Sequence, residues 1–217
     1  MKSFNLLYFF AIAILLLSCK LPDKKEKPDK EETARIENIK AYKKSLDSIN
    51  KNLGWTKTSF GLYKSKNGDL GLKTSEGTEE GIIIEKYITE MADGQALKSV
   101  IDSATFSYLG SSFYKDKNHV YTHYAMADGG NFWTVDNADV KTFQVLGNCY
   151  AKDKNKIFTE RNMEADTIFD YHSFRTCDDC GCFAKDKKGY YFWDEKLDIN
   201  AIEDKETEAI VAKLKKL

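Results

Sequence analysis

The hydrophobic and polar positions of the chain follow two different periods, one before and one after residue 55. In residues 34–54 the apolar positions recur at spacings of 3, 3, 4, 3 and 4, namely Ile36, Ile39, Tyr42, Leu46, Ile49 and Leu53. This spacing is typical of one apolar stripe along a helix. Glu31 and Glu32 suit the positive end of that helix, and Gly54 can end it. We expect an amphipathic helix over residues 34–54 that packs against its own domain.

From Trp55 onward, short runs of β-branched and aromatic residues alternate with turn residues. Asn67-Gly68 lies between two such runs in residues 60–73, which is typical of a β-hairpin. The β-branched run at residues 82–88 predicts another strand. We therefore expect residues 55–101 to form a β-hairpin region.

A second helical stripe lies near the C-terminus, within residues 198–217. Its apolar positions are Ile202, Ile210, Val211, Leu214 and Leu217. Asp204 or Thr207 is suited to cap its start. We expect this short C-terminal helix to cover an exposed end of the sheet.

Three segments of the chain align with one another: residues 112–124, 149–161 and 182–195. Each consists of an aromatic strand, a turn and a second strand, and the turn aspartates lie 37 and 33 residues apart. Asp favours the first position of such a turn, while Asn or Gly tolerates a left-handed position and Lys needs only water. The turn residues are Asp116, Lys117 and Asn118, then Asp153, Lys154 and Asn155, then Asp186 and Lys187.

Recurrence of a unit of about 35 residues predicts a repeat architecture over residues 102–197. The hairpin at 60–73 is a candidate fourth copy. One hairpin cannot bury its aromatic face alone, so neighbouring copies must stack or pair. The fold class predicted for the whole chain is mainly β (α+β), with antiparallel β-hairpin repeats between an N-terminal and a C-terminal helix.

Adjacent aromatic residues occur in two of the predicted strands, at Phe132-Trp133 and at residues 190–193. Successive side chains of a strand point to opposite faces, so these rings lie on both faces. We expect at least one face to contact something other than the primary core. Trp133, Tyr191 and Trp193 are therefore candidates for stacking on a sugar or a partner protein.

The Asp-Lys-Asn turns, with a lead-in such as Thr-Phe-Gln-Val-Leu-Gly at residues 142–147, resemble the DKNYY family over roughly residues 93–195. The chain departs from the pattern where Tyr-Tyr becomes Val120-Tyr121 or Ile157-Phe158, and where Asn becomes Lys188. These substitutions keep β propensity and turn tolerance. The resemblance implies a bacterial, often envelope, protein of unknown activity.

The N-terminus has the pattern of an export signal. Lys2 precedes an unbroken apolar run, Leu6 to Leu17, which as a helix would be about 18 Å long and too short for a hydrocarbon core of about 30 Å. Leu16-Leu17-Ser18-Cys19 then resembles a bacterial lipobox. We expect a cleaved signal peptide over 1–18 and a lipidated Cys19.

Residues 19–33 contain the lipidated cysteine, both prolines of the chain and many charges, so they are expected to be a solvated tether. This arrangement predicts a lipid anchor in a bacterial membrane, at the cell envelope and in particular the outer membrane, on its periplasmic or surface side.

Composition supports a folded domain, because 42% of the residues are hydrophobic. The 33 basic and 34 acidic residues leave a formal charge of −1. Binding to a phosphate backbone usually depends on a basic excess, so no nucleic acid partner is expected.

Four cysteines remain besides Cys19, namely Cys149, Cys177, Cys180 and Cys182. An even number in an exported chain favours disulfides, and the repeat alignment makes Cys149 and Cys182 equivalent. We expect Cys149 to bond one of the later three. Alternatively, Cys177 and Cys180 form a redox or metal-binding CxxC, although Asp178 and Asp179 between them would raise a thiol pKa and no second CxxC is present.

No Gly-rich phosphate loop or nucleophile motif is present in the sequence, so we expect no enzyme, no cofactor and no resident metal. The leading interpretation is a lipid-anchored, non-enzymatic binding module with a protein or glycan partner. One alternative is a thiol-disulfide or metal-handling envelope protein that uses Cys177, Cys180 and Cys182. The other is a purely structural envelope lipoprotein. The sequence leaves the oligomeric state open.

Overall fold

A computed structural model describes residues 29–161 and 168–217. The predicted signal peptide, Cys19 and most of the predicted tether lie outside these residues. The chain divides into two units, residues 1–38 and residues 39–217. The second unit contains every described strand, in antiparallel sheets, and this confirms the expected mainly β fold with a helix near each end.

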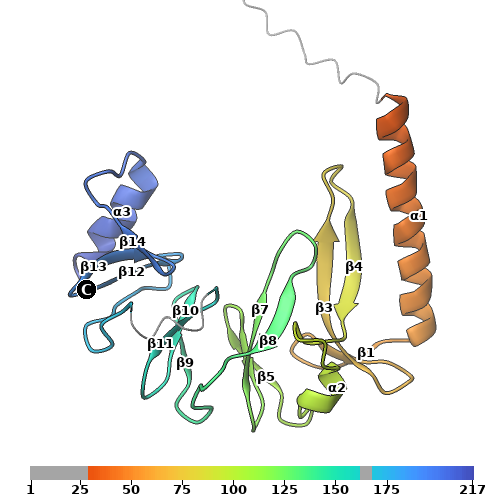
Figure 1. Cartoon of the computed structure of the whole chain (residues 1–217), viewed down its shortest axis with the longest axis horizontal. Helices are drawn as coiled ribbons and strands as arrows, with labels where there is room; N and C mark the ends of the chain where they lie inside the picture. Colours follow the sequence, from red (N-terminus) through yellow and green to blue (C-terminus); the bar gives the residue numbers. More distant parts are fainter. Residues whose placement is uncertain (1–28, 162–167) are drawn as a thin grey trace, which may run out of the picture. The chain divides into compact units, whose positions relative to one another are not determined.

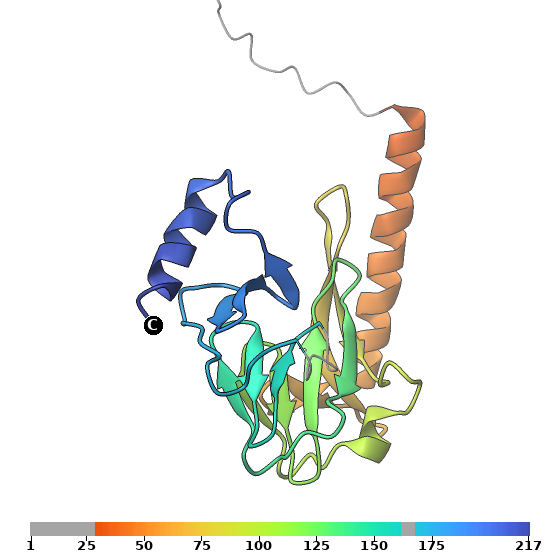
Figure 2. The same cartoon turned by 60° about the vertical axis from the view of Figure 1, so that its left-hand side comes forward.

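The strands form four sheets, and in each sheet the neighbouring strands are also neighbours in sequence (Figures 1 and 2). The first sheet contains β1 (Thr56–Ser59), β2 (Leu62–Lys64), β3 (Leu70–Gly77) and β4 (Ile83–Ile88). The short helix α2 (Leu97–Val100) precedes the second sheet, which contains β5 (Ser107–Gly110), β6 (Phe113–Lys115), β7 (Val120–Tyr124) and β8 (Asn131–Thr134). The third contains β9 (Gln144–Leu146), β10 (Tyr150–Lys152) and β11 (Ile157–Thr159), and the fourth β12 (Phe183–Asp186), β13 (Gly189–Phe192) and β14 (Glu195–Leu197).

The N-terminal helix, α1, spans Lys30–Leu53 and so begins four residues before the predicted start. Asp29 is the reason, because its Oδ1 accepts a hydrogen bond of 2.8 Å from the Glu32 amide at the start of the helix. Gly54, with a φ of 58°, ends the helix in the left-handed region. The last residues of the predicted tether are therefore helical.

The apolar stripe of α1 is only partly covered, which corrects the expectation of one packed face. No residue of α1 is buried, and Tyr42 and Ile49 are 49% and 50% exposed. Polar residues also contact the first sheet: Lys43 Nζ donates to the Ile83 carbonyl at 2.9 Å, and Asn50 Nδ2 to the Glu85 carbonyl at 3.4 Å. Leu46 and Leu53 of the stripe are half-buried on the same side, so the face of α1 that meets the sheet combines part of the apolar stripe with these two polar residues.

Four copies of one hairpin unit follow one another along the chain. In each, a backbone amide in the second strand or directly after it donates to the carbonyl just before the first strand; these bonds are Lys73 to Gly61, His123 to Ser112, Glu160 to Cys149 and Trp193 to Cys182. A lead-in residue also pairs with a lysine in each unit: Thr56 with Lys64, Ser107 with Lys115, Gln144 with Lys152 and Arg175 with Lys185. We name residues 55–73, 102–124, 139–161 and 170–193 the first, second, third and fourth copies.

The hydrophobic core consists of three clusters, one between each pair of successive copies. In the second sheet, Tyr121 and Phe132 pack toward the first copy, while Phe113 and Val120 pack toward the third. Each face of this sheet therefore packs against a neighbouring copy. The cover is incomplete, because, of the adjacent rings in β8, Phe132 is 0% exposed whereas Trp133 is only half-buried, which agrees with the expectation that one of the two lies outside the primary core.

The C-terminal helix, α3, spans Lys205–Leu214 and lies beside the last sheet (Figure 2). Asp204 caps its start, since its side chain accepts a 2.7 Å hydrogen bond from the Thr207 amide. Val211 and Leu214 are buried on its inner side. Among the described residues, no helix combines the length and the apolar character that crossing a membrane requires.

Candidate functional site

The Asp-Lys-Asn turns are held by one hydrogen-bond pattern that recurs in three copies. In the second copy, Asp116 Oδ1 accepts from the amides of Asn118 (2.7 Å) and His119 (2.8 Å), and its Oδ2 accepts from the Asp102 amide at 2.7 Å. Asp153 and Asp186 make the equivalent bonds, to the amides of Asn155, Lys156 and Asp139 and to those of Lys188, Gly189 and Asp170. The turn aspartate thus ties the hairpin to its lead-in.

The turn lysines form ion pairs, which corrects the expectation that they need only water. Lys117 Nζ lies 2.5 Å from an Asp102 carboxylate oxygen, Lys154 Nζ 2.7 Å from Asp139 and Lys187 Nζ 2.8 Å from Asp170. The Lys117 backbone amide also contacts the lead-in, where it donates to Thr105 Oγ1 at 3.0 Å. The equivalent amides of Lys154 and Lys187 donate to Thr142 and Ser173.

Sequence reasoning missed these lead-in partners although a signal for them was present. Asp-x-x-(Thr/Ser)-Phe occurs at residues 102–106, 139–143 and 170–174, before each turn. The Asp of this motif forms an ion pair with the turn lysine, and the hydroxyl of the Thr or Ser accepts a hydrogen bond from the backbone amide of that lysine. The Phe is buried in the core. The two short motifs together define the repeat better than the turn alone.

Hydrogen bonds and burial shift the pKa values of the aspartates and of one tyrosine in this turn network. The hydrogen bond from Lys154 is the main cause that lowers the pKa of Asp139 to about 2. Burial and the bond to Asp116 raise the pKa of Tyr121 far above its usual value. For Asp116 itself, burial opposes ionisation, but the hydrogen bonds from Asp102, Tyr121, His119 and Asn118 outweigh it and lower the pKa. These groups hold the copy together and their acceptor atoms are engaged, so the turns are structural.

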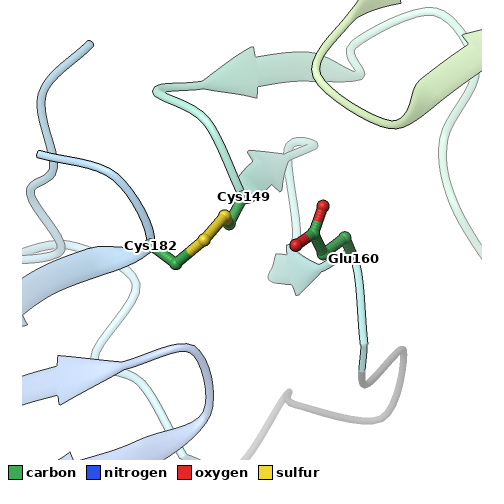
Figure 3. Close-up of side chains that lie close together, drawn as sticks. All are labelled: Cys149, Glu160 and Cys182. Carbon is green, nitrogen blue, oxygen red and sulfur yellow. A yellow bond between two sulfur atoms is a disulfide. The ribbon is translucent and has the colours of Figure 1, made fainter. Parts of the chain in front are cut away.

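The four cysteines form two disulfides, Cys149–Cys182 and Cys177–Cys180. The first joins the third and fourth copies at equivalent positions, in agreement with the expected bond from Cys149 to one of the later three. Glu160 lies beside it (Figure 3), within 4.8 Å of both sulfur atoms. Its carboxylate accepts from Trp193 Nε1 at 3.0 Å and from Ser112 Oγ at 3.1 Å, so it connects three copies.

The CxxC pair has one half-buried and one buried member: Cys180 is 0% exposed and Cys177 is half-buried. The carboxylate of Asp179 lies 3.2 Å from Cys177 Sγ. A second contact of Asp179, 2.5 Å from Lys213 Nζ, links this loop to α3 and lowers the pKa of the carboxyl group. A negative charge at the sulfur disfavours a thiolate, which redox chemistry requires.

Two of the predicted stacking aromatics meet in a partly exposed cluster. We name Tyr124, Trp133, Arg161 and Trp193 the aromatic–arginine cluster. The guanidinium carbon of Arg161 lies 3.6 Å from the centroid of the Trp193 ring and 5.6 Å from that of Tyr124, and Arg161 Nε donates to the Tyr124 hydroxyl at 2.9 Å. Trp133 stands 6.4 Å from Tyr124, centroid to centroid. Arg161 is exposed and the three rings are half-buried.

Two features of this cluster were not predicted from the sequence. Arg161 was not predicted, and the repeat alignment is the signal that would have found it, because Arg161 occupies the position of Tyr124 in the next copy. Trp193 has a φ of 53°, in the left-handed region that a tryptophan rarely adopts. A residue held in such a conformation is often part of a functional site.

Tyr191, the third predicted stacking residue, is only 2% exposed. It lies in the core between the third and fourth copies, and its hydroxyl donates to Asp186 at 3.0 Å. A buried ring cannot stack on a ligand, so Tyr191 is a core residue, equivalent to Tyr121 in the second copy.

The model of the DKNYY family matches residues 23–162, which is more than half of the chain. The match begins earlier than the resemblance in the turns suggested, includes the first three copies and ends before the fourth. No curated protein and no solved structure matches the chain. On this match, the chain belongs to the DKNYY family.

Proposed function

We propose that the chain is a lipid-anchored envelope protein whose repeat domain acts as a non-enzymatic binding module, with the aromatic–arginine cluster as its contact surface. The observation that carries this proposal is the partial exposure of Trp133 and Trp193 beside an exposed Arg161. Partly exposed Trp, Tyr and Arg side chains are the residues most enriched at the energetic centres of protein interfaces.

The cluster is assembled by the repeat array rather than by one hairpin. Tyr124 belongs to the second copy, Arg161 to the third and Trp193 to the fourth. The indole N–H of Trp193 donates a hydrogen bond to the Glu160 carboxylate, and the backbone amide of Trp193 donates to the Cys182 carbonyl at 2.8 Å. A surface held this firmly loses little conformational entropy on binding. Its partner in this proposal is a protein or a glycan of the envelope.

The anchor part of the proposal rests on Leu16-Leu17-Ser18-Cys19 and the apolar run before it. Its test is the intact mass of the protein extracted from the envelope. We expect a chain that begins at Cys19 and carries acyl groups. A full-length, unacylated chain would contradict the anchor without bearing on the binding surface.

The binding surface is tested by site-specific photo-crosslinking in living cells, with benzoylphenylalanine in place of Trp133. The matched control carries the same probe at Tyr108, which is 44% exposed and lies outside the cluster. We expect discrete adducts from position 133 that disappear with Arg161→Ala, and none from position 108. Equal adducts at both positions, or none at 133, would contradict the proposal.

A thiol-disulfide role is the second candidate, because Cys177 and Cys180 form a CxxC disulfide with a half-buried first cysteine. Glutathione redox titration with mass readout tests it. A pair that exchanges readily near the potential of the glutathione pool supports the role, and one that stays oxidised under those conditions opposes it.

A further inference from the structure

A cavity of about 580 Å³ lies between the third and fourth copies. It is formed by β9, β10 and β11 on one side and by residues 171–178 of the fourth copy on the other. Its volume falls in the range of small-molecule sites, about 300–1,000 Å³. It shares no residue with the aromatic–arginine cluster, so the inference below goes beyond the proposed function.

Beside this cavity the residues of one repeat position make different contacts from those in the preceding pair of copies. Between the second and third copies, Lys115 Nζ donates to the Val140 carbonyl at 3.4 Å. In the next pair of copies Lys152 stands in the place of Lys115, and Tyr171 in that of Val140. Tyr171 turns its hydroxyl to the Asp153 carbonyl at 2.7 Å, and Lys152 lines the cavity.

Positive charge lines this space. Lys152, Arg175 and His172 all border it, and Arg175 Nη1 donates to the backbone carbonyls of Phe174 at 2.7 Å and His172 at 3.2 Å. Carbonyls orient a guanidinium without neutralising its charge. Within the described ranges 29–161 and 168–217, the ion pairs include neither Lys152 nor Arg175.

One carboxylate also borders the cavity, that of Asp178, which is exposed. With Lys152 and Arg175 at +2 and Asp178 at −1, the lining keeps a formal charge of +1 when His172 is neutral. Lys152 is half-buried, so its charge is less well solvated than that of a surface lysine. A ligand oxyanion would replace the lost solvation.

The wall is constrained by covalent and steric features. Gly147 has a φ of 57°, and a Cβ at this position would lie 2.9 Å from the Cys177 carbonyl oxygen, so the chain approaches closely only because the residue is glycine. The Cys177–Cys180 disulfide closes the facing loop. The lining residues are thus positioned before any ligand arrives.

We propose that this cavity is a binding site for a small oxyanion-bearing molecule, with Lys152 and Arg175 contacting its carboxylate or phosphate group. Arginine presents paired N–H groups that match both kinds of oxyanion, and lysine adds a point charge. Tyr171 and His172, which also line the cavity, offer ring faces to the remainder of the molecule.

The test is isothermal titration calorimetry of the full chain in detergent with inorganic phosphate, glucuronate and glucose. We expect phosphate or glucuronate to bind and glucose not to, and the anion that binds identifies the source of the oxyanion. Lys152→Ala and Arg175→Gln should each raise Kd about tenfold or more, the effect of losing one charge-assisted hydrogen bond. Lys115→Ala, at the same repeat position in the filled core, should leave Kd unchanged.

Three results would overturn the inference: no heat with either anion, equal binding of glucose, or equal weakening by Lys115→Ala. Circular dichroism of each variant establishes that it is folded, and a variant that unfolds is replaced by Lys152→Gln or Arg175→Lys. The crosslinking from position 133 does not depend on the cavity, so failure here is distinguishable from failure of the proposed function.

Discussion

The core between the second and third copies and the core between the third and fourth copies have the same backbone pattern but are closed differently. The former is filled by side chains such as Phe113, Phe143 and Phe158, with no cysteine among its buried residues. The latter contains the Cys149–Cys182 disulfide and leaves the cavity beside Lys152. The same turn hydrogen bonds occur in the copies on either side of both cores. They determine the conformation within each copy, whereas the contacts between copies differ from one pair to the next.

The largest expected effect comes from emptying the filled core. Phe158 is 0% exposed and packs 5.2 Å from Phe143, centroid to centroid. Phe158→Ala should lower the free energy of unfolding by about 3–5 kcal/mol, the usual loss for a buried phenylalanine, in a urea titration. Phe158→Leu is the control and should cost clearly less. Equal losses for the two variants would mean that this core tolerates a void.

The second prediction concerns the disulfide of the other core. Replacing Cys149 and Cys182 together by Ala should cost about 3–4 kcal/mol, because the bond closes a separation of 33 residues in the unfolded chain. Replacing Cys177 and Cys180 removes a bond across only 3 residues and should cost about 2 kcal/mol by the same chain-entropy relation. Urea titrations of both pairs test this order, and the reverse order would contradict it.

The third prediction compares a turn with its natural variant in the first copy. Ser65 stands where later copies have Asp, and its Oγ accepts a 3.1 Å hydrogen bond from the Asp69 amide. Asp116→Ser should therefore keep the turn but leave the Tyr121 hydroxyl and the Asp102 amide without their acceptor, at a cost of about 2–3 kcal/mol. Adding Tyr121→Phe, which copies Phe158 in the third copy, should recover part of this loss. If the double variant recovers no stability, the loss caused by Asp116→Ser does not come from the unpaired Tyr121 hydroxyl.

The smallest effect is electrostatic and common to both cores. The lysine hydrogen bonds lower the folded-state pKa of Asp102, Asp139 and Asp170 below the unfolded value of about 4. Their contribution to stability is therefore full above pH 4 and is lost as pH falls through the folded pKa, about 2 for Asp139.

The melting temperature should accordingly fall between pH 4 and pH 2, and Asp139→Asn should flatten this dependence. Lys154→Met, which removes the partner cation, should flatten it in the same way. A pH profile unchanged by both substitutions would show that Asp139 has the same pKa in the folded and unfolded chain.

Local sequence determined much of this architecture. Helical spacing predicted α1 and α3, and of the two predicted caps of α3, Asp204 and Thr207, Asp204 accepts the bond from the Thr207 amide. The alignment of Asp116, Asp153 and Asp186 predicted the repeats, because a turn that must accept several backbone amides needs a carboxylate in one place. Such features depend on residues close in the chain, where spacing fixes geometry.

Other features followed only from tertiary structure. Tyr191 and Trp193 are two residues apart and equally aromatic, yet one is in the core and the other is in a partly exposed cluster. Residues two apart in a strand share a face, but β13 ends at Phe192 and Trp193 has a φ of 53°, so the alternation of the strand does not continue to Trp193. The spacing of the aromatic residues does not reveal this change of backbone conformation. The exposure of Tyr42 and Ile49 in α1 was likewise not evident from spacing, because the face that meets the first sheet includes Lys43 and leaves these two side chains outside it.

The sequence by itself thus determined the elements, the repeat unit and the equivalence of Cys149 with Cys182. Tertiary structure decided the disulfide partners, the meeting of Arg161 with Trp193 and the cavity beside Lys152. The physical reason is distance along the chain. Arg161 and Trp193 lie 32 residues apart, and only the stacking of successive copies, driven by burial of their aromatic faces, brings such residues into contact.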